Sequence, residues 1–145
     1  MTANTMLAIM NRDRLVFALQ SDNRYFRAHR EFCNEDMGTV PQDTIALILE
    51  NCDITDDALR GATHLTSLRC LDLDSTAITD LALGAVASLP ALEELWLECT
   101  AVTDEGLRQL HACRVLRFLS VVYTGVSAAG VADLKSAVPD VEISQ

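Results

Sequence analysis

The sequence predicts an α/β solenoid in which short parallel strands alternate with helices. A pattern with a period of 24 residues recurs four times between residues 44 and 140. Each copy has alternating leucines, which suit a short strand with one buried face. Each then has apolar residues at helical spacing, which suit a helix with one buried face. One copy cannot bury its own apolar side chains, whereas stacked copies can.

The leucine columns predict the strands, which we expect to be parallel with these side chains facing inward. The first column holds Leu47, Leu71, Leu95 and Leu119, and the second holds Leu49, Leu73, Leu97 and Val121. The chain closes with residues 141–145, which have the pattern of one further strand.

A small polar column and a capping column follow each strand and predict the turn and the helix. The small polar residues are Cys52, Thr76, Thr100 and Thr124. We expect them to bond backbone amides of the turn that would otherwise be buried and unpaired. The expected helix N-caps are Thr55, Thr79, Thr103 and Ser127. The acids after the caps, such as Asp80, suit the positive end of the helix dipole.

Together these columns, LxxLxLxxC/TxITDxxLxxL, resemble the leucine-rich-repeat family over residues 44–143. The match is most similar to the short Cys/Thr type with an ITD motif, found in bacterial repeat proteins and related to the cysteine-containing repeats of F-box proteins. The resemblance implies a right-handed leucine-rich-repeat solenoid with a parallel concave sheet and convex helices. It also implies a scaffold that binds other molecules, because the family binds many different partners.

Residues 1–40 lie outside the repeat and are interpreted as an N-terminal helical cap before a solenoid over residues 41–145. The first predicted helix contains Met6, Leu7, Ile9, Met10, Leu15, Val16, Phe17 and Leu19. Ser21 and Asp22 could cap a second helix running through Tyr25, Phe26 and Phe32. Open solenoids need their end repeats covered, which favours the cap. The alternative is that this helical pair docks a partner.

The charge disfavours nucleic acid and membrane partners. The chain has 21 acidic and 11 basic residues, a formal charge of −10, and polyanions repel it. No apolar run approaches the ~18–20 residues of a membrane-spanning helix, and the N-terminus lacks the order of a secretory signal. The five cysteines are odd in number and form no CxxC pair, which favours reduced, mostly buried thiols. We therefore expect a cytoplasmic protein.

The positions between the leucines predict a concave binding surface. Arg69, Glu93 and Arg117 should form a cross-strand charge ladder with a structural role. The stack of Glu50, Asp74 and Glu98 brings like charges together, which destabilises a sheet, and nothing in the repeat pattern requires acids there. Exposed aromatic side chains beside them would be typical binding anchors. The predicted site residues are Glu50, Asp72, Asp74, Glu94, Trp96, Glu98, Phe118, Ser120 and Tyr123. The alternative is that the acids are solvated strand ends and Trp96 packs on its neighbours.

No pattern indicates an enzyme, a cofactor or a metal site. The three histidines, His29, His64 and His111, are spread apart, with no HExxH motif or nucleophile elbow. His111 and Cys113 have no second ligand pair. The carboxylate stack offers oxygen ligands for Ca²⁺, but no EF-hand-like loop accompanies it.

The leading hypothesis is a non-enzymatic protein–protein interaction module that binds a basic protein on its acidic, aromatic concave face. The first alternative is an immunity or inhibitor protein that neutralises a basic toxin such as a nuclease, by analogy with ribonuclease inhibitor, also a leucine-rich-repeat protein. The second is a substrate-recognition adaptor, although residues 1–40 show no F-box signature. The oligomeric state stays open.

Overall fold

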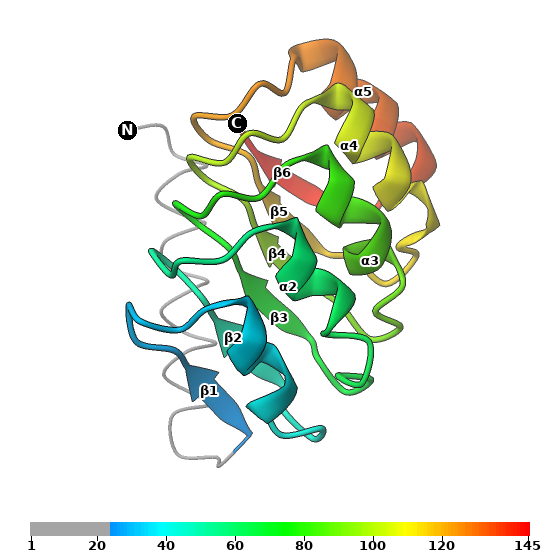
Figure 1. Cartoon of the computed structure of the whole chain (residues 1–145). Helices are drawn as coiled ribbons and strands as arrows, with labels where there is room; N and C mark the ends of the chain where they lie inside the picture. The colour runs from blue at the N-terminus through cyan, green and yellow to red at the C-terminus, as the bar shows by residue number, and fades with distance from the viewer. Residues whose placement is uncertain (1–23) are drawn as a thin grey trace.

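The computed structural model describes residues 24–145, which form one parallel sheet with helices along one side (Figure 1). The sheet has six strands in sequential order, and every neighbouring pair is parallel. The strands are β1 (Tyr25–Arg27), β2 (Ala46–Ile48), β3 (Cys70–Asp72), β4 (Glu94–Trp96), β5 (Phe118–Ser120) and β6 (Glu142–Ser144). This arrangement confirms the predicted solenoid, including the strand near the end of the chain.

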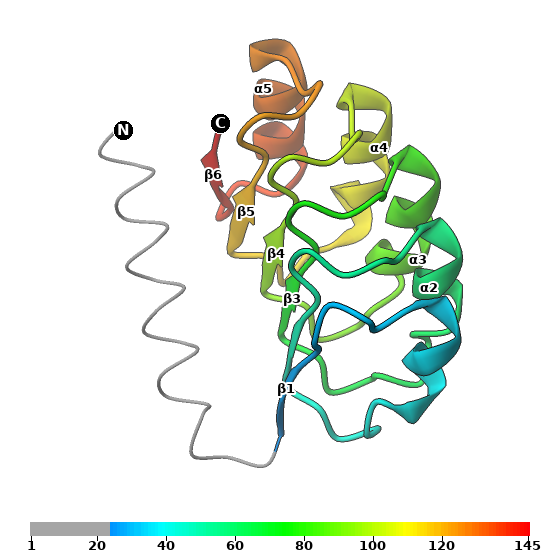
Figure 2. The same cartoon turned by 60° about the vertical axis from the view of Figure 1, so that its left-hand side comes forward.

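The helices lie together on one side of the sheet, as the turned view shows (Figure 2). They are η1 (Asn34–Thr39), α2 (Asp56–Arg60), η2 (Asp80–Ala82), α3 (Leu83–Ala87), α4 (Asp104–Gln109), η3 (Leu110–Ala112) and α5 (Ala128–Ala137). Most are only one or two turns long. Isolated helices of this length are unstable in water, so packing against the sheet and against neighbouring helices stabilises them.

The register places equivalent residues of successive repeats side by side. Leu71 of β3 pairs with Leu47 of β2 and with Leu95 of β4, and all three are buried. The main core therefore runs as a continuous column of leucines between the sheet and the helices.

The predicted helix through Tyr25, Phe26 and Phe32 is wrong. Tyr25–Arg27 is strand β1, which pairs with β2, and the helical turn η1 follows later. The reason is alternation: Phe26 packs against the main core, whereas Tyr25 packs on the opposite face of the sheet. A strand places neighbouring side chains on opposite faces in this way. Residues 24–40 thus add one more strand and turn before the four predicted repeats.

The first predicted helix, over residues 6–19, and its neighbours Ser21 and Asp22 lie outside the described residues. The role of residues 1–40 as a cap stays a prediction.

Carboxylates tie each repeat to the next. Asp80 accepts two hydrogen bonds from Thr103 of the following repeat, one from its backbone N–H at 2.7 Å and one from its hydroxyl at 2.6 Å. The same pair of bonds joins Asp56 to Thr79 and Asp104 to Ser127. In the first unit Asn34 bonds Thr55 through both atoms of its amide. The Thr-Asp motif is therefore an inter-repeat joint as well as a helix start. The bonds from Ser127 lower the pKa of Asp104.

The joint also explains two glycines in the helices. A Cβ atom on Gly106 would overlap Asp80 Oδ1, and one on Gly130 would overlap Asp104 Oδ1. In these two repeats the carboxylate of the preceding repeat occupies the space that a side chain would need. The glycines make room for the hydrogen bonds, even though glycine is a poor helix former.

The small polar column makes different bonds from those predicted. The hydroxyls of Thr76 and Thr100 donate to the carbonyls of Leu73 and Leu97, at 2.5 and 2.7 Å. They were expected to accept from turn amides, and Thr124 alone in this column does so, from Val126. The turn's inward carbonyl is the group that needs a partner.

The capping predictions hold for three of the four positions. Thr79, Thr103 and Ser127 accept a hydrogen bond from a backbone N–H in the first turn of their helices. Thr55 makes no such side-chain bond, because its hydroxyl accepts from Asn34 instead.

One column of turn residues adopts a left-handed backbone conformation. Asn51, Ser75, Cys99 and Tyr123 have φ values of 59°, 55°, 54° and 57°. The N–H of Ser75 donates to the Glu98 carbonyl at 2.8 Å, and the equivalent bond is made by Asn51 and by Cys99. The turn therefore continues the hydrogen-bond ladder between repeats, at a cost of roughly 1–2 kcal/mol per residue in this conformation.

We predict that Ser75→Asn stabilises the protein, because asparagine tolerates this conformation better than serine does. The free energy of unfolding in urea should rise by a few tenths of a kcal/mol to about 1 kcal/mol. Ala77→Asn is the matched control, since Ala77 is exposed two residues away and has no positive φ. Equal effects at the two positions would contradict the explanation.

We predict that Asp80→Ala destabilises the protein by at least about 1 kcal/mol, because it removes two hydrogen bonds to a charged acceptor. Urea unfolding measures the loss. Asp57→Ala is the control: Asp57 bonds Arg60 within its own helix and joins no repeats, so its loss should be within about 0.5 kcal/mol. A loss at Asp57 as large as that at Asp80 would refute the special role of the joint.

Candidate partner-binding surface

The face of the sheet opposite the helices has a small apolar cluster. Trp96 and Phe118 lie on neighbouring strands with ring centroids 4.7 Å apart. Ala46, Ile48 and Cys70 complete the cluster, and Tyr25 packs at its edge. The predicted concave residues are thus brought together. Their predicted exposure is wrong: Trp96 is 1% exposed and Phe118 is 8% exposed.

The acids on this face act largely as hydrogen-bond acceptors within the sheet. Asp72 is 0% exposed and accepts the backbone N–H of Asp74 at 3.0 Å. Asp74 is also buried and accepts the backbone N–H of Glu98 at 2.7 Å. Ser120 donates its hydroxyl to Glu98 at 2.6 Å. These bonds give Asp72 and Asp74 a structural role, so they are not solvated strand ends.

The other charged columns form ion pairs between repeats. Arg69 binds Glu93 through two nitrogen–oxygen contacts of 2.8 Å, and this pairing lowers the pKa of Glu93. The third member of the expected ladder differs, because Arg117 pairs with Asp140 at 3.2 Å. The Oε2 atom of Glu50 lies 3.3 Å from Nη2 of Arg27 on β1, which is another ion pair between neighbouring strand units.

Glu94 differs from every other acid described here. Its Oε2 atom is buried and has no hydrogen-bond partner among the described residues. Burial, with the nearby Glu93 charge, raises the pKa of Glu94 to about 7. At neutral pH Glu94 is therefore partly protonated and contributes less negative charge to the surface than its residue type suggests.

Tyr123 is the one predicted site residue that is fully exposed, at 84%. It lies in the turn after β5, where the left-handed backbone directs the chain off the strand. That turn is hydrogen-bonded to the preceding repeat, since the backbone N–H of Cys99 donates to the carbonyl of Val122. Glu98 and Glu50 occupy the equivalent edge in earlier repeats and are partly exposed. We call Glu50, Glu98 and Tyr123 the turn-edge surface.

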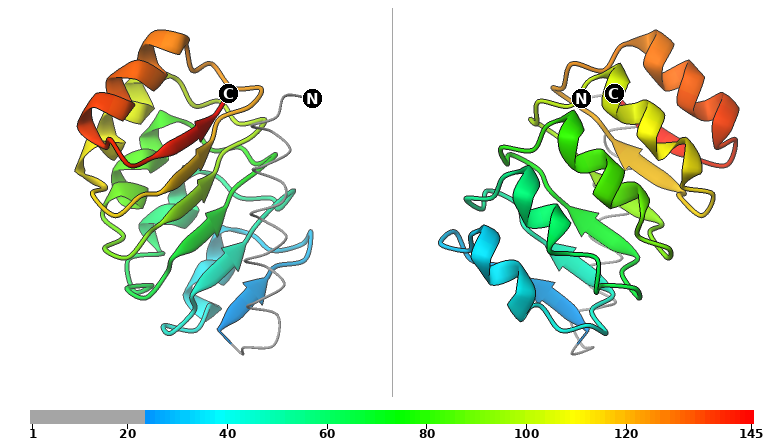
Figure 3. Two further views of the ribbon diagram at one scale, coloured as in Figure 1. Left: turned by 180° about the vertical axis from the view of Figure 1, so that it is seen from behind. Right: turned by 45° about the vertical axis from the view of Figure 1, so that its right-hand side comes forward.

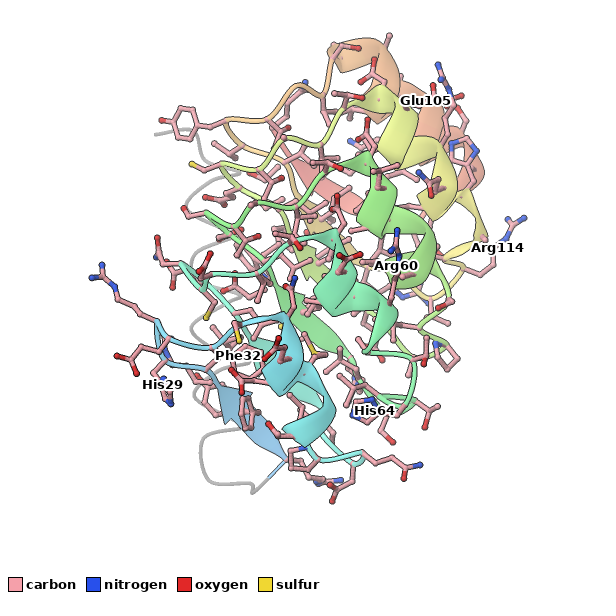
Figure 4. All side chains as sticks on the ribbon, viewed as in Figure 1. His29, Phe32, Arg60, His64, Glu105 and Arg114 are labelled. Carbon is pink, nitrogen blue, oxygen red and sulfur yellow. The ribbon has the colours of Figure 1, made fainter. Side chains whose placement is uncertain are left out.

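The histidines have structural contacts. His64, labelled in Figure 4, follows helix α2. Both of its ring nitrogens lie near backbone carbonyl oxygens, Nδ1 at 3.0 Å from that of Gly61 and Nε2 at 2.9 Å from that of Val40. His111 Nε2 lies 3.1 Å from Asp133 on α5. Among residues 24–145, no three His, Cys, Asp or Glu side chains gather as a metal site would require.

The cysteines are all reduced, and most are buried. Cys52, Cys70 and Cys113 are buried, and burial raises the pKa of Cys113 to about 11, which disfavours the reactive thiolate. Cys99 is exposed in its turn. No helix of the described residues is long and apolar enough to cross a membrane.

We predict opposite pH effects for two adjacent glutamates. The pKa of Glu94 is raised, so the folded state binds an extra proton between pH 4.5 and about 7 and stability falls across that range. Glu94→Gln should flatten this fall and increase stability above pH 7. The pKa of Glu93 is lowered, so its stabilisation is present above pH 4.5 and is lost as the pH falls. Glu93→Gln should therefore destabilise at neutral pH.

Urea unfolding of both variants at pH 5 and pH 8 measures these effects. Parallel pH profiles for the two variants would contradict the assignment of opposite shifts.

The comparisons with known proteins agree with this architecture. A family model described as a leucine-rich repeat matches residues 64–87. A search of curated protein sequences found no match. A leucine-rich-repeat protein of Leptospira interrogans has a similar solved structure, with a TM-score of 0.52 and 22% identity. The match covers 71% of this chain but 26% of that protein, so this chain spans about a quarter of its length.

The structure of the leiomodin-1 actin-binding site 2 is also similar, with a TM-score of 0.59 and 14% identity. The match covers 77% of this chain and 75% of that one. At these identities the likeness concerns the fold. The repeated columns, the matched family model and the sheet of stacked strand–helix units lead to one conclusion: this chain has the fold of a leucine-rich-repeat solenoid.

Proposed function

We propose that the protein is a non-enzymatic protein-interaction module whose partner is a basic protein. Its fold generally serves as a scaffold for protein binding, and one similar solved structure is named as an actin-binding site. A fold hosts many functions, so the surface has to decide between them. A cytoplasmic location with reduced thiols belongs to the same proposal.

The exposed side chain of Tyr123 carries this proposal. A tyrosine that is 84% exposed leaves a large amphipathic surface in water, and tyrosine is enriched among residues that dominate binding energy. It lies beside the turn of the preceding repeat, which includes Glu98. An aromatic anchor with acidic neighbours suits a basic protein segment.

The buried aromatic pair is a poor anchor by comparison. Trp96 and Phe118 have little surface left to offer a partner, and Asp72 and Asp74 already accept backbone hydrogen bonds. We therefore propose that, of the nine site residues predicted from the sequence, the three of the turn-edge surface contact the partner. The overall charge of −10 favours a basic partner and speeds its encounter with the surface.

We predict that Tyr123→Ala weakens partner binding at least about tenfold, which is 1.4 kcal/mol. The double variant Glu50→Gln/Glu98→Gln should mainly slow association and reduce the salt dependence. The measurement is capture from the source lysate at low and moderate salt, followed by titration with the purified partner. Asp74 is left unchanged because its substitution would break a backbone hydrogen bond.

Leu81→Ala is the control, since Leu81 is another exposed large apolar residue but lies on η2, away from the turn-edge surface. If Leu81→Ala weakens capture as much as Tyr123→Ala, the turn edge is not the contact. If wild type captures no basic protein at either salt concentration, the proposed function fails.

A further inference from the structure

The imidazole ring of His64 has two contacts that a neutral ring cannot satisfy together. Its Nδ1 atom lies 3.0 Å from the carbonyl oxygen of Gly61, and its Nε2 atom lies 2.9 Å from that of Val40. A carbonyl oxygen only accepts hydrogen bonds, whereas a neutral imidazole carries a proton on one nitrogen alone. Only the protonated ring, with an N–H on each nitrogen, can donate to both carbonyls.

The next repeat shows in which direction the first of these bonds runs. Ser88 occupies the position equivalent to His64, and its hydroxyl donates to the carbonyl of Ala85 at 2.6 Å. Ala85 is in turn equivalent to Gly61. In both repeats a side chain bonds a carbonyl at the end of the helix, which is a role that histidine can take at helix C-termini. By this equivalence Nδ1 carries a proton, so the bond to Val40 needs a second proton.

The bond to Val40 joins two units of the solenoid. Val40 is buried and directly follows η1, so it belongs to the first unit, residues 24–40. Opposite views show this unit in blue to cyan at one end of the stack (Figure 3). His64 belongs to the next unit, which begins with β2. The pair of bonds between Asn34 and Thr55 also joins these two units, but it involves no group that titrates.

No ion pair competes for the His64 ring within the described residues. Asp36 accepts hydrogen bonds from Cys33, Asp56 accepts from Thr79, and Asp57 pairs with Arg60. Glu35 and Asp43 are exposed, and salt screens their charge. The carbonyls of Gly61 and Val40 are thus the groups that distinguish the protonated ring from the neutral one. The charged side chains on the elements around the ring are Glu35, Asp36, Asp43, Asp56, Asp57 and Arg60.

We propose that His64 is a proton-dependent clasp between the first unit and the repeat that follows it. The protonated ring donates to Gly61 and to Val40 at once. When the ring loses its proton, one hydrogen bond is lost and a nitrogen lone pair faces a carbonyl oxygen. The clasp is therefore closed in acid and opens as the pH rises through the range where histidine titrates, which is near pH 6.5 in peptides. The clasp acts within the chain and needs no partner.

Hydrogen exchange of the full chain, measured by mass spectrometry at pH 5.5 and pH 8, tests the clasp. The rates are corrected for the intrinsic effect of pH on exchange, so that they report how often a segment opens. In wild type we expect residues 24–40 to open about tenfold more often at pH 8 than at pH 5.5. This factor corresponds to the loss of one hydrogen bond from a charged donor.

His64→Ser is the informative variant, because Ser88 shows that a serine can make the bond to the helix end. It removes the bond to Val40 and the group that titrates. We expect its first unit to open equally often at both pH values, at about the wild-type level of pH 8. His29→Ser is the matched control, since His29 lies in the same unit and is exposed (Figure 4). This control should keep the pH dependence of wild type.

A first unit that opens equally often at both pH values in wild type would overturn the proposal. An unchanged pH dependence in His64→Ser would overturn it too, because another group would then be responsible. If His64→Ser does not fold, nitrogen-15 NMR of the wild-type ring decides. Both ring nitrogens of His64 should carry a proton at pH 5.5 and only one at pH 8. The same number of protons at both pH values would overturn the clasp. None of these outcomes depends on partner binding, so they are distinct from a failure of the proposed function.

Discussion

Stacking in register is the constraint on which this structure depends. Leu71 is buried because Leu47 and Leu95 lie on either side of it, one repeat away in each direction. A slip of one residue in the strand pairing would turn the leucines to the wrong face of the sheet. The pairing matters more than the length between strands, since Phe26 and Leu47 are 21 residues apart and Phe26 still packs against the main core.

Two lines of hydrogen bonds keep the repeats in this register. The strands provide the first, and the left-handed turns at residues such as Ser75 extend it beyond the strand ends. The aspartates at the helix starts provide the other, through the bonds of Asp80 to Thr103 and their equivalents. Isolated bridges such as that between Thr79 and Ala101 lie between the two. The short helices are stable here because these hydrogen bonds hold each repeat against its neighbours.

The two faces of the sheet have different chemistry. The helical face is a continuous apolar core, whereas the concave face combines an aromatic pair with carboxylates. Most of these carboxylates are engaged: Asp72 and Asp74 accept backbone N–H groups, and Glu98 accepts from Ser120. The like charges that looked unfavourable as a stack are thus stabilised by the hydrogen bonds they receive. We therefore propose that a partner contacts the turn edge, which is a narrower surface than the sequence suggested.

The sequence by itself determined the fold of residues 44–145, because the same pattern of strand and helix recurs in each repeat. Where one copy matches the pattern weakly, the other copies still indicate which elements to expect. It did not determine β1, because three residues such as Tyr25–Arg27 have no period of their own and became a strand by pairing with β2. The tertiary structure also decided which of the predicted site residues are exposed. Sequence placed Trp96 and Phe118 on the concave face, but their burial depends on neighbours from other strands, such as Ile48 and Cys70, which only the folded sheet brings together.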